Sequence, residues 1–271
     1  MSAAASIRTS DGRTLQVADA GGAGFPLLWQ AGSPHTGDLI GPVRAAAEAA
    51  GLRLIGWARP GYGASTRWPD RRIADAAADA AVVADALGID RFALAGYSGG
   101  GPHALAAAAL LPDRVAAVGT FASVAPDTGG DDWLAGMASP EALTAARQGR
   151  AAREALPDDF DPESFVAADW AALGGPLAAI GEDAVRAGSQ GTDGLVDDDV
   201  AFAQPWGVDL ARVTAPVLLV QGDADRVIPP AHARLLGAAI PHAEVRIRPG
   251  DGHVSVLAAL SEVFAALAAA R

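Results

Sequence analysis

Short apolar runs alternate along this chain with alanine-rich stretches, and this alternation restricts the possible fold more than any other feature. The runs at residues 26–30, 52–57, 91–97, 114–123, 215–222 and 243–249 have the character of buried strands. The stretches near 38–50, 70–87, 101–111 and 230–239 have helical character. Buried strands separated by helices predict an α/β fold in which helices flank both faces of a mostly parallel sheet. The first residues predict a hairpin that turns at Asp11-Gly12 and lies at one sheet edge.

The alternation stops between residues 124 and 206. This region is richer in charge, glycine and proline, it lacks strand-like runs, and it holds three of the six tryptophans, Trp133, Trp170 and Trp206. We predict that residues 124–206 form a helical cap inserted into a core domain made of residues 1–123 and 207–271. The length of 271 residues is sufficient for one core of this kind with an insertion.

Composition excludes several classes of site and partner. The chain has no cysteine, so disulfides and thiolate chemistry are impossible, and all 20 basic residues are arginines, which removes P-loop and Schiff-base lysines. A net charge of −12 opposes binding to nucleic acid and to anionic membranes. Neither a signal-peptide core nor an apolar run of about 18 residues is present. We expect a cytoplasmic monomer or homodimer that acts on a small molecule without a cofactor.

The stretch "GYSGG" places Ser98 between a predicted strand and a predicted helix. In that context G-x-S-x-G is typical of a nucleophile elbow, a sharp turn that holds the serine in a strained backbone conformation. Side chains at Gly96 or Gly100 would collide with neighbouring backbone. The pattern alone is weak in a chain with 32 glycines, and the strand–turn–helix context gives it meaning.

A serine hydroxyl needs a base, and the base needs a carboxylate that orients it. Behind an elbow of this type the expected chain order is serine, acid, histidine. "GDADRVIP" supplies Asp225 after one strand, and "GDGH" supplies His253 after the next. Asp223 is better suited to stabilising its own turn, and Asp251 to capping the helix that follows His253. The sequence therefore predicts a triad of Ser98, Asp225 and His253.

The other four histidines have simpler interpretations. We expect His103 to be packed behind the elbow, and His232 and His242 to be solvated near helix ends. His35 lies in the loop after the strand at 26–30, where facing the pocket and packing both remain open. No spacing of histidine and acidic residues resembles a metal site.

Acyl transfer also needs N–H donors for the developing oxyanion. One should be the N–H of Gly99, directly after the nucleophile, and the other should come from the loop "QAGSPHTG". There Gly32 permits close approach and Ser33 would present its N–H. The alternative is an ordinary Gly-Ser-Pro turn.

Together these pieces resemble the α/β-hydrolase superfamily, in the branch of proline-iminopeptidase-like, esterase-like and cofactor-free haloperoxidase-like proteins. The matching stretches are "QAGSP", "RPGYGAS", "GYSGGGPHALA", "GDADRVIP" and "GDGH", in the expected order. The family often has histidine where this chain has Ala31 and aspartate where it has Ala58. Both substitutions predict weaker polar support around the oxyanion loop.

The resemblance implies a serine hydrolase that works through an acyl-enzyme, with small carboxylic esters as the first choice of substrate. A serine nucleophile argues against dehalogenase and epoxide hydrolase chemistry. An aminopeptidase is the alternative, because the predicted cap offers carboxylates for a free amino group; these are Asp131, Asp132, Glu141 and Glu154. A ligand-binding or lyase member of the fold without hydrolytic turnover also remains open.

Overall fold

The computed structural model describes residues 3–157 and 160–270, and within them one eight-stranded sheet forms the centre of the molecule. The strand order is β1-β2-β4-β3-β5-β6-β7-β8. Strand β2 runs antiparallel to its neighbours β1 and β4, and the remaining pairs are parallel. The strands are β1 Ala3–Arg8, β2 Thr14–Asp19, β3 Phe25–Gln30, β4 Leu52–Trp57, β5 Phe92–Tyr97, β6 Val115–Phe121, β7 Val217–Gly222 and β8 Ala243–Arg248.

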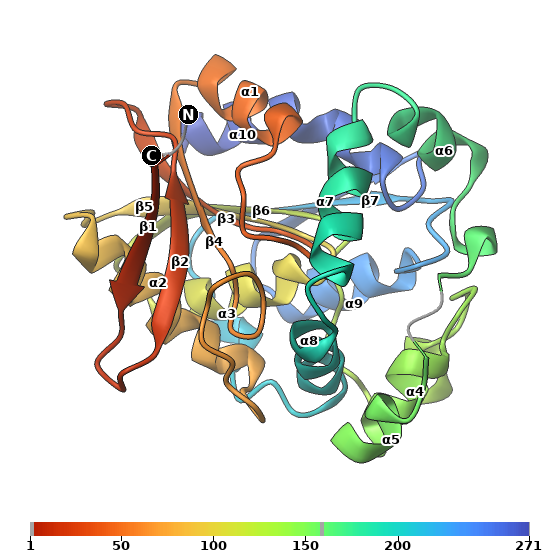
Figure 1. Ribbon diagram of the computed structural model, residues 1–271. Helices are drawn as coiled ribbons and strands as arrows, with labels where there is room; N and C mark the ends of the chain where they lie inside the picture. The colour runs from red at the N-terminus through yellow and green to blue at the C-terminus, as the bar shows by residue number, and fades with distance from the viewer. Residues whose placement is uncertain (1–2, 158–159, 271) are drawn as a thin grey trace.

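Helices cover both faces of this sheet, as Figure 1 shows. Helices α1 (Gly41–Ala49) and α10 (Leu260–Ala269) lie on one face, and α2 (Ala76–Ala86), α3 (Gly100–Leu110) and α9 (Ala231–Ala239) lie on the other. Each face has its own apolar cluster. Strand β5 is buried along its whole length because both of its faces are covered, which explains its unbroken apolar sequence. The predicted α/β-hydrolase architecture is confirmed.

The predicted hairpin and the predicted central strands form close to their expected bounds. Gly12 has a φ of 89° in the turn between β1 and β2, a conformation that glycine adopts without strain. The helix expected near 70–87 begins later, at Ala76, after a 3-10 turn over Ile73–Asp75. The Asp75 carboxylate accepts a hydrogen bond from the Arg72 N–H at 2.7 Å and caps that turn.

The chain between β6 and β7 is helical, and we refer to its residues 124–206 as the inserted segment. Its α-helices gather at one end of the sheet (Figure 1). They are α4 Glu141–Arg147, α5 Arg150–Glu154, α6 Ala167–Leu173, α7 Ala178–Gly188 and α8 Asp193–Ala203. Trp133 and Trp206 are buried in apolar packing, whereas Trp170 is 46% exposed. Within the described residues, none of the helices has the length and apolar character needed to cross a bilayer.

Candidate active site

Ser98 occupies a tight turn between β5 and α3. Its φ is 51°, a conformation that costs a non-glycine residue of the order of 1–3 kcal/mol. The residues two positions before and after Ser98 must be glycine. A Cβ on Gly96 would lie 2.6 Å from the carbonyl oxygen of Gly100, and a Cβ on Gly100 would lie 2.1 Å from the carbonyl oxygen of Gln30. The N–H of Ser98 donates to the Phe121 carbonyl at 2.8 Å. The turn is therefore held by close backbone packing at Gly96 and Gly100 and by the bond from Ser98 to β6.

Three side chains from separate loops form one hydrogen-bonded chain. Ser98 Oγ lies 3.0 Å from Nε2 of His253, and Nδ1 of the same ring lies 2.9 Å from Oδ2 of Asp225. A carboxylate accepts, so Nδ1–H donates to Asp225 and Nε2 is free to accept from the serine hydroxyl. All three residues are buried, with Ser98 at 9% exposure. The structure thus brings together the three residues that the sequence predicts as a triad.

Asp225 is fixed by donors on both of its oxygens. Oδ1 accepts from the backbone N–H groups of Val227 at 2.9 Å and Ile228 at 2.8 Å. Oδ2 accepts from Nε2 of Gln221 at 3.0 Å in addition to the imidazole. These bonds hold the carboxylate in place and define the direction in which it faces the ring.

The neighbouring aspartates have different partners. Asp223 accepts from the N–H of Gly250 at 2.7 Å and so ties together the two loops that follow β7 and β8. Asp251 was expected to cap the helix after His253, and that prediction is wrong, because its carboxylate accepts from Arg248 at 2.6 Å. The capping group is Asp169 of helix α6, which sequence reasoning did not find.

The loop after β3 packs directly against the elbow. A Cβ on Gly99 would lie 2.4 Å from Oγ of Ser33, and one on Gly32 would lie 3.4 Å from Cβ of Ser98. Within the part of the chain that the structure describes, neither the N–H of Ser33 nor that of Gly99 donates to a protein acceptor. Both residues predicted as oxyanion donors therefore adjoin Ser98 and keep their N–H groups available.

Arg59 supports this loop, so the weakening expected from Ala31 and Ala58 does not follow. Its Nη1 donates to the carbonyl of Ala31 at 2.5 Å, and its Nη2 donates to the carbonyl of Gly32 at 3.1 Å and to Oγ of Ser33 at 2.8 Å. The guanidinium fork can hold several acceptors in one plane, and here it fixes three consecutive residues of the loop.

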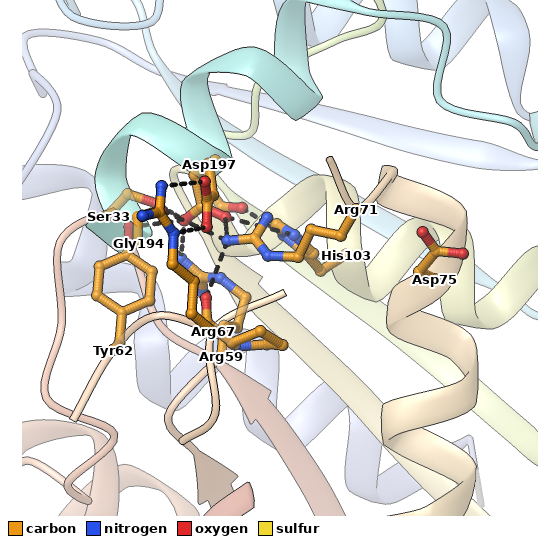
Figure 2. A network of polar contacts seen from close by, with 12 residues as sticks. Ser33, Arg59, Tyr62, Arg67, Arg71, Asp75, His103, Gly194 and Asp197 are labelled. Atoms are coloured by element: carbon orange, nitrogen blue, oxygen red, sulfur yellow. Dashed lines mark hydrogen bonds and ion pairs between the residues drawn. The ribbon is translucent and has the colours of Figure 1, made fainter. Parts of the chain in front are cut away.

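Asp198 of helix α8 balances the charge of Arg59. Its Oδ2 accepts from Arg59 at 2.7 Å, from the Ser33 hydroxyl at 2.5 Å and from the Tyr62 hydroxyl at 2.8 Å, while Oδ1 accepts from Arg71 at 2.7 Å. Figure 2 shows Ser33, Arg59, Tyr62 and Arg71 gathered around this network. Burial alone would raise the pKa of Asp198, but the charges of Arg59 and Arg71 hold it well below its usual range.

His103 lies on α3 behind the elbow, packed as predicted. It is buried, and its Nδ1–H donates to the carbonyl of Gly99 at 2.8 Å. Burial, and next the charge of Arg59, lowers the pKa of His103 to about 3. The ring is therefore neutral at neutral pH and helps to fix the turn that carries the N–H of Gly99.

The burial and contacts of the remaining histidines show which of them are packed and which are exposed. His35 is buried and stacks on Tyr62 with ring centroids 4.5 Å apart, which is a packing role. His232 was expected to be solvated, and that is wrong: it is fully buried, accepts from the N–H of Ala125 at 3.0 Å and donates to the carbonyl of Trp133 at 2.8 Å. His242 is exposed, as expected.

Comparison with known proteins supports the fold described above. The family model described as "alpha/beta hydrolase fold" matches residues 31–141. The thermophilic esterase from Thermogutta terrifontis superimposes with a TM-score of 0.71 at 22% identity, covering 98% of this chain and 96% of the esterase. The enol-lactonase from Burkholderia xenovorans LB400 superimposes with a TM-score of 0.72 at 21% identity, covering 97% of this chain and 98% of the enol-lactonase. The protein therefore has the α/β-hydrolase fold.

One curated relative shares a shorter region. Rhodomycin D methylesterase DauP from Streptomyces sp. (strain C5) is 43% identical over 63 residues, which is 23% of this chain. The match spans 21% of the length of the methylesterase. This similarity is local.

Proposed function

We propose that this protein is a hydrolase of the α/β-hydrolase fold that cleaves small carboxylic esters through an acyl-enzyme formed on Ser98. The observation that carries the proposal is the continuous hydrogen-bonded chain from Ser98 through His253 to Asp225. A serine hydroxyl bonded to a neutral imidazole, whose other nitrogen donates to a fixed carboxylate, is the arrangement that activates the nucleophile for acyl transfer.

Each group then has a defined part. Ser98 Oγ attacks the ester carbonyl carbon while its proton moves to Nε2 of His253, and Asp225 stabilises the imidazolium. The N–H groups of Gly99 and Ser33 donate to the oxyanion of the tetrahedral intermediate. The imidazolium gives the proton to the leaving alcohol as the ester C–O bond breaks. A water molecule then transfers a proton to His253 and attacks the acyl carbon. The bond between the acyl carbon and Ser98 Oγ breaks, His253 returns the proton to Oγ, and the acid is released.

The carboxylates of the inserted segment favour esters over peptides with a free amino terminus. The four that the sequence offered for an ammonium group, Asp131, Asp132, Glu141 and Glu154, are all exposed. The buried ones near the predicted triad, Asp169 and Asp198, already accept hydrogen bonds from the protein on both oxygens. The names of the methylesterase, the esterase and the enol-lactonase also indicate ester and lactone substrates.

The test is a turnover assay with p-nitrophenyl acetate, butyrate and octanoate beside amino-acid p-nitroanilides. We expect ester hydrolysis that falls by about 10⁴-fold or more in Ser98→Ala and in His253→Ala, because these side chains act as a unit. Cleavage of the anilides in preference to the esters would favour the aminopeptidase. Ester turnover that Ser98→Ala retains would overturn the proposal, and absence of all turnover in the folded protein would favour a ligand-binding role.

A further inference from the structure

The backbone of His253 is held by a carboxylate that lies far away in the sequence. Asp169 on α6 has no exposed surface. Its Oδ2 accepts from the N–H of His253 at 3.1 Å, and its Oδ1 accepts from the N–H groups of Val254 and Ser255, both at 2.8 Å. The hydroxyl of Ser255 adds a further bond at 2.9 Å. Three successive backbone N–H groups, beginning with that of the histidine, therefore converge on one side chain of the inserted segment.

No cation balances this carboxylate within the described ranges 3–157 and 160–270. The backbone N–H groups at the start of the 3-10 turn Ser255–Ala259 provide the positive partial charge instead. Asp169 also accepts from the N–H of Val166 at 3.2 Å, which fixes the carboxylate at the beginning of its own helix. The same side chain thus joins the first turn of α6 to the loop that presents His253.

The residue before the histidine leaves space for the carboxylate. A Cβ on Gly252 would lie 2.1 Å from Oδ2 of Asp169 and 2.6 Å from Cγ2 of Val166. The glycine of "GDGH" thus fits a partner supplied by the inserted segment, and even a methyl group at this position would displace that partner.

The position of this backbone decides where the imidazole lies. Nε2 of His253 must stay near Ser98 Oγ and Nδ1 near Asp225, at 3.0 Å and 2.9 Å in the structure. A displacement of about 1 Å in a reacting group can lower a rate by about 10²-fold. Removing the bonds to Asp169 releases the backbone of His253, whose imidazole must stay close to both Ser98 and Asp225.

We propose that Asp169 is a positioning residue for His253, so that the inserted segment helps to build the catalytic base. This role rests on the proposed function, because it matters only if His253 activates Ser98. Asp169 touches neither the substrate nor the transferred proton, and it acts through the backbone of the histidine.

The competing interpretation is that Asp169 only attaches the inserted segment to the core. Asp197 on α8 provides the matched comparison, because it too is buried and accepts from the core, from Nε and Nη2 of Arg67 at 3.0 Å each. It also pairs with Arg150 of the inserted segment. Among the described residues, no hydrogen bond joins Asp197 to the loop of His253 or to the loop after β3. Asp197→Asn therefore weakens attachment without releasing the histidine.

The experiment measures the rate at which a fluorophosphonate probe labels Ser98 in the full chain. Wild type, Asp169→Asn, Gly252→Ala and Asp197→Asn are compared, and the urea midpoint of each reports its stability. The probe needs no knowledge of the natural substrate. Asp169→Asn places an amide N–H₂ against N–H donors, whereas Gly252→Ala displaces the carboxylate and keeps its charge, so the second variant gives an answer if the first does not fold. With an ester substrate, kcat and KM are measured for the same set.

We expect labelling to slow by about 10²-fold in Asp169→Asn and in Gly252→Ala, with kcat reduced in proportion and KM changed far less. Asp197→Asn should label within about threefold of wild type although its urea midpoint falls. Equal labelling rates in wild type and the two Asp169-site variants would overturn the positioning role and leave the proposed function intact. A wild type that the probe does not label at Ser98 would overturn the proposed function, and the positioning role with it.

Discussion

Two buried aspartates of the inserted segment contact the candidate site in chemically different ways. Asp198 on α8 lies between the guanidinium groups of Arg59 and Arg71, so its charge is balanced by full opposite charges. Asp169 on α6 is bound by backbone N–H groups and one hydroxyl, so only partial charges face it. One aspartate is part of an ion network, and the other is a helix cap.

Removing the two aspartates should therefore have different effects on the protein. Loss of Asp198 leaves two buried cations without their counter-ion, which is a cost to the whole fold. Loss of Asp169 leaves N–H groups unsatisfied in one loop, a smaller cost that falls on His253. We therefore predict that Asp198 chiefly stabilises the protein, whereas Asp169 chiefly orients His253.

The largest expected effect is on stability at Asp198. Asp198→Asn should lower the free energy of unfolding by about 3–5 kcal/mol, because it removes the charge that compensates buried Arg59 and Arg71. Asp197→Asn is the control on the same helix: Asp197 also binds two arginines, but Arg67 and Arg150 are 31% and 22% exposed. Solvent screening should limit the loss there to about 1 kcal/mol. Urea unfolding of both variants checks this, and equal losses would remove the distinction.

The second effect is on the rate of ester hydrolysis and concerns Arg59, whose guanidinium links Asp198 to the predicted oxyanion loop. Arg59→Lys keeps the charge but loses the fork that holds Ala31, Gly32 and Ser33. We expect kcat for an ester to fall by about 10²-fold, the usual cost of one oxyanion donor. Arg67→Lys, at a half-exposed ion pair, serves as the control. A kcat in Arg59→Lys equal to that of the control would show that the loop holds its position without this arginine.

The smallest effect is the contribution of His103 to pH dependence. Its pKa is about 3 in the folded protein and about 6.5 when unfolded, so between these values the unfolded chain binds one more proton. Stability from this group is complete above pH 6.5 and is lost as the pH falls, by about 1.4 kcal/mol per pH unit. Asp198 remains charged in this window because its pKa lies far lower. His103→Gln should flatten the slope by that amount in urea unfolding at pH 5 and 6, and an unchanged slope would refute this.

The sequence was sufficient for those features that depend on local pattern. Strand runs such as 92–97 are apolar because the sheet is covered on both faces, and the glycines around Ser98 are needed because the turn leaves no space for a Cβ. The positions of Asp225 and His253 followed from their place after β7 and β8. Each of these signals lies within a few residues of the group it predicts.

The contributions of the inserted segment could not be predicted in this way. Asp169 is 84 residues from His253, and Asp198 is 165 residues from Ser33, with no motif that links either pair. One local signal was present: Gly252 left a space beside the histidine, although nothing in the sequence said what filled it. At the loop of Ala31 the sequence indicated a loss of polar support that the structure does not show, because Arg59 supplies this support. Arg59 belongs to the stretch "RPGYGAS", but nothing in the sequence indicated that it contacts this loop.

The most direct measurement is to react the protein with a fluorophosphonate and locate the adduct by mass spectrometry, with Ser98→Ala and His253→Ala alongside. We expect one adduct per chain on Ser98, none at that position in Ser98→Ala, and labelling slowed by about 10³-fold or more in His253→Ala. A folded wild type that stays unmodified, or one that His253→Ala labels equally fast, would contradict the claim that His253 activates Ser98.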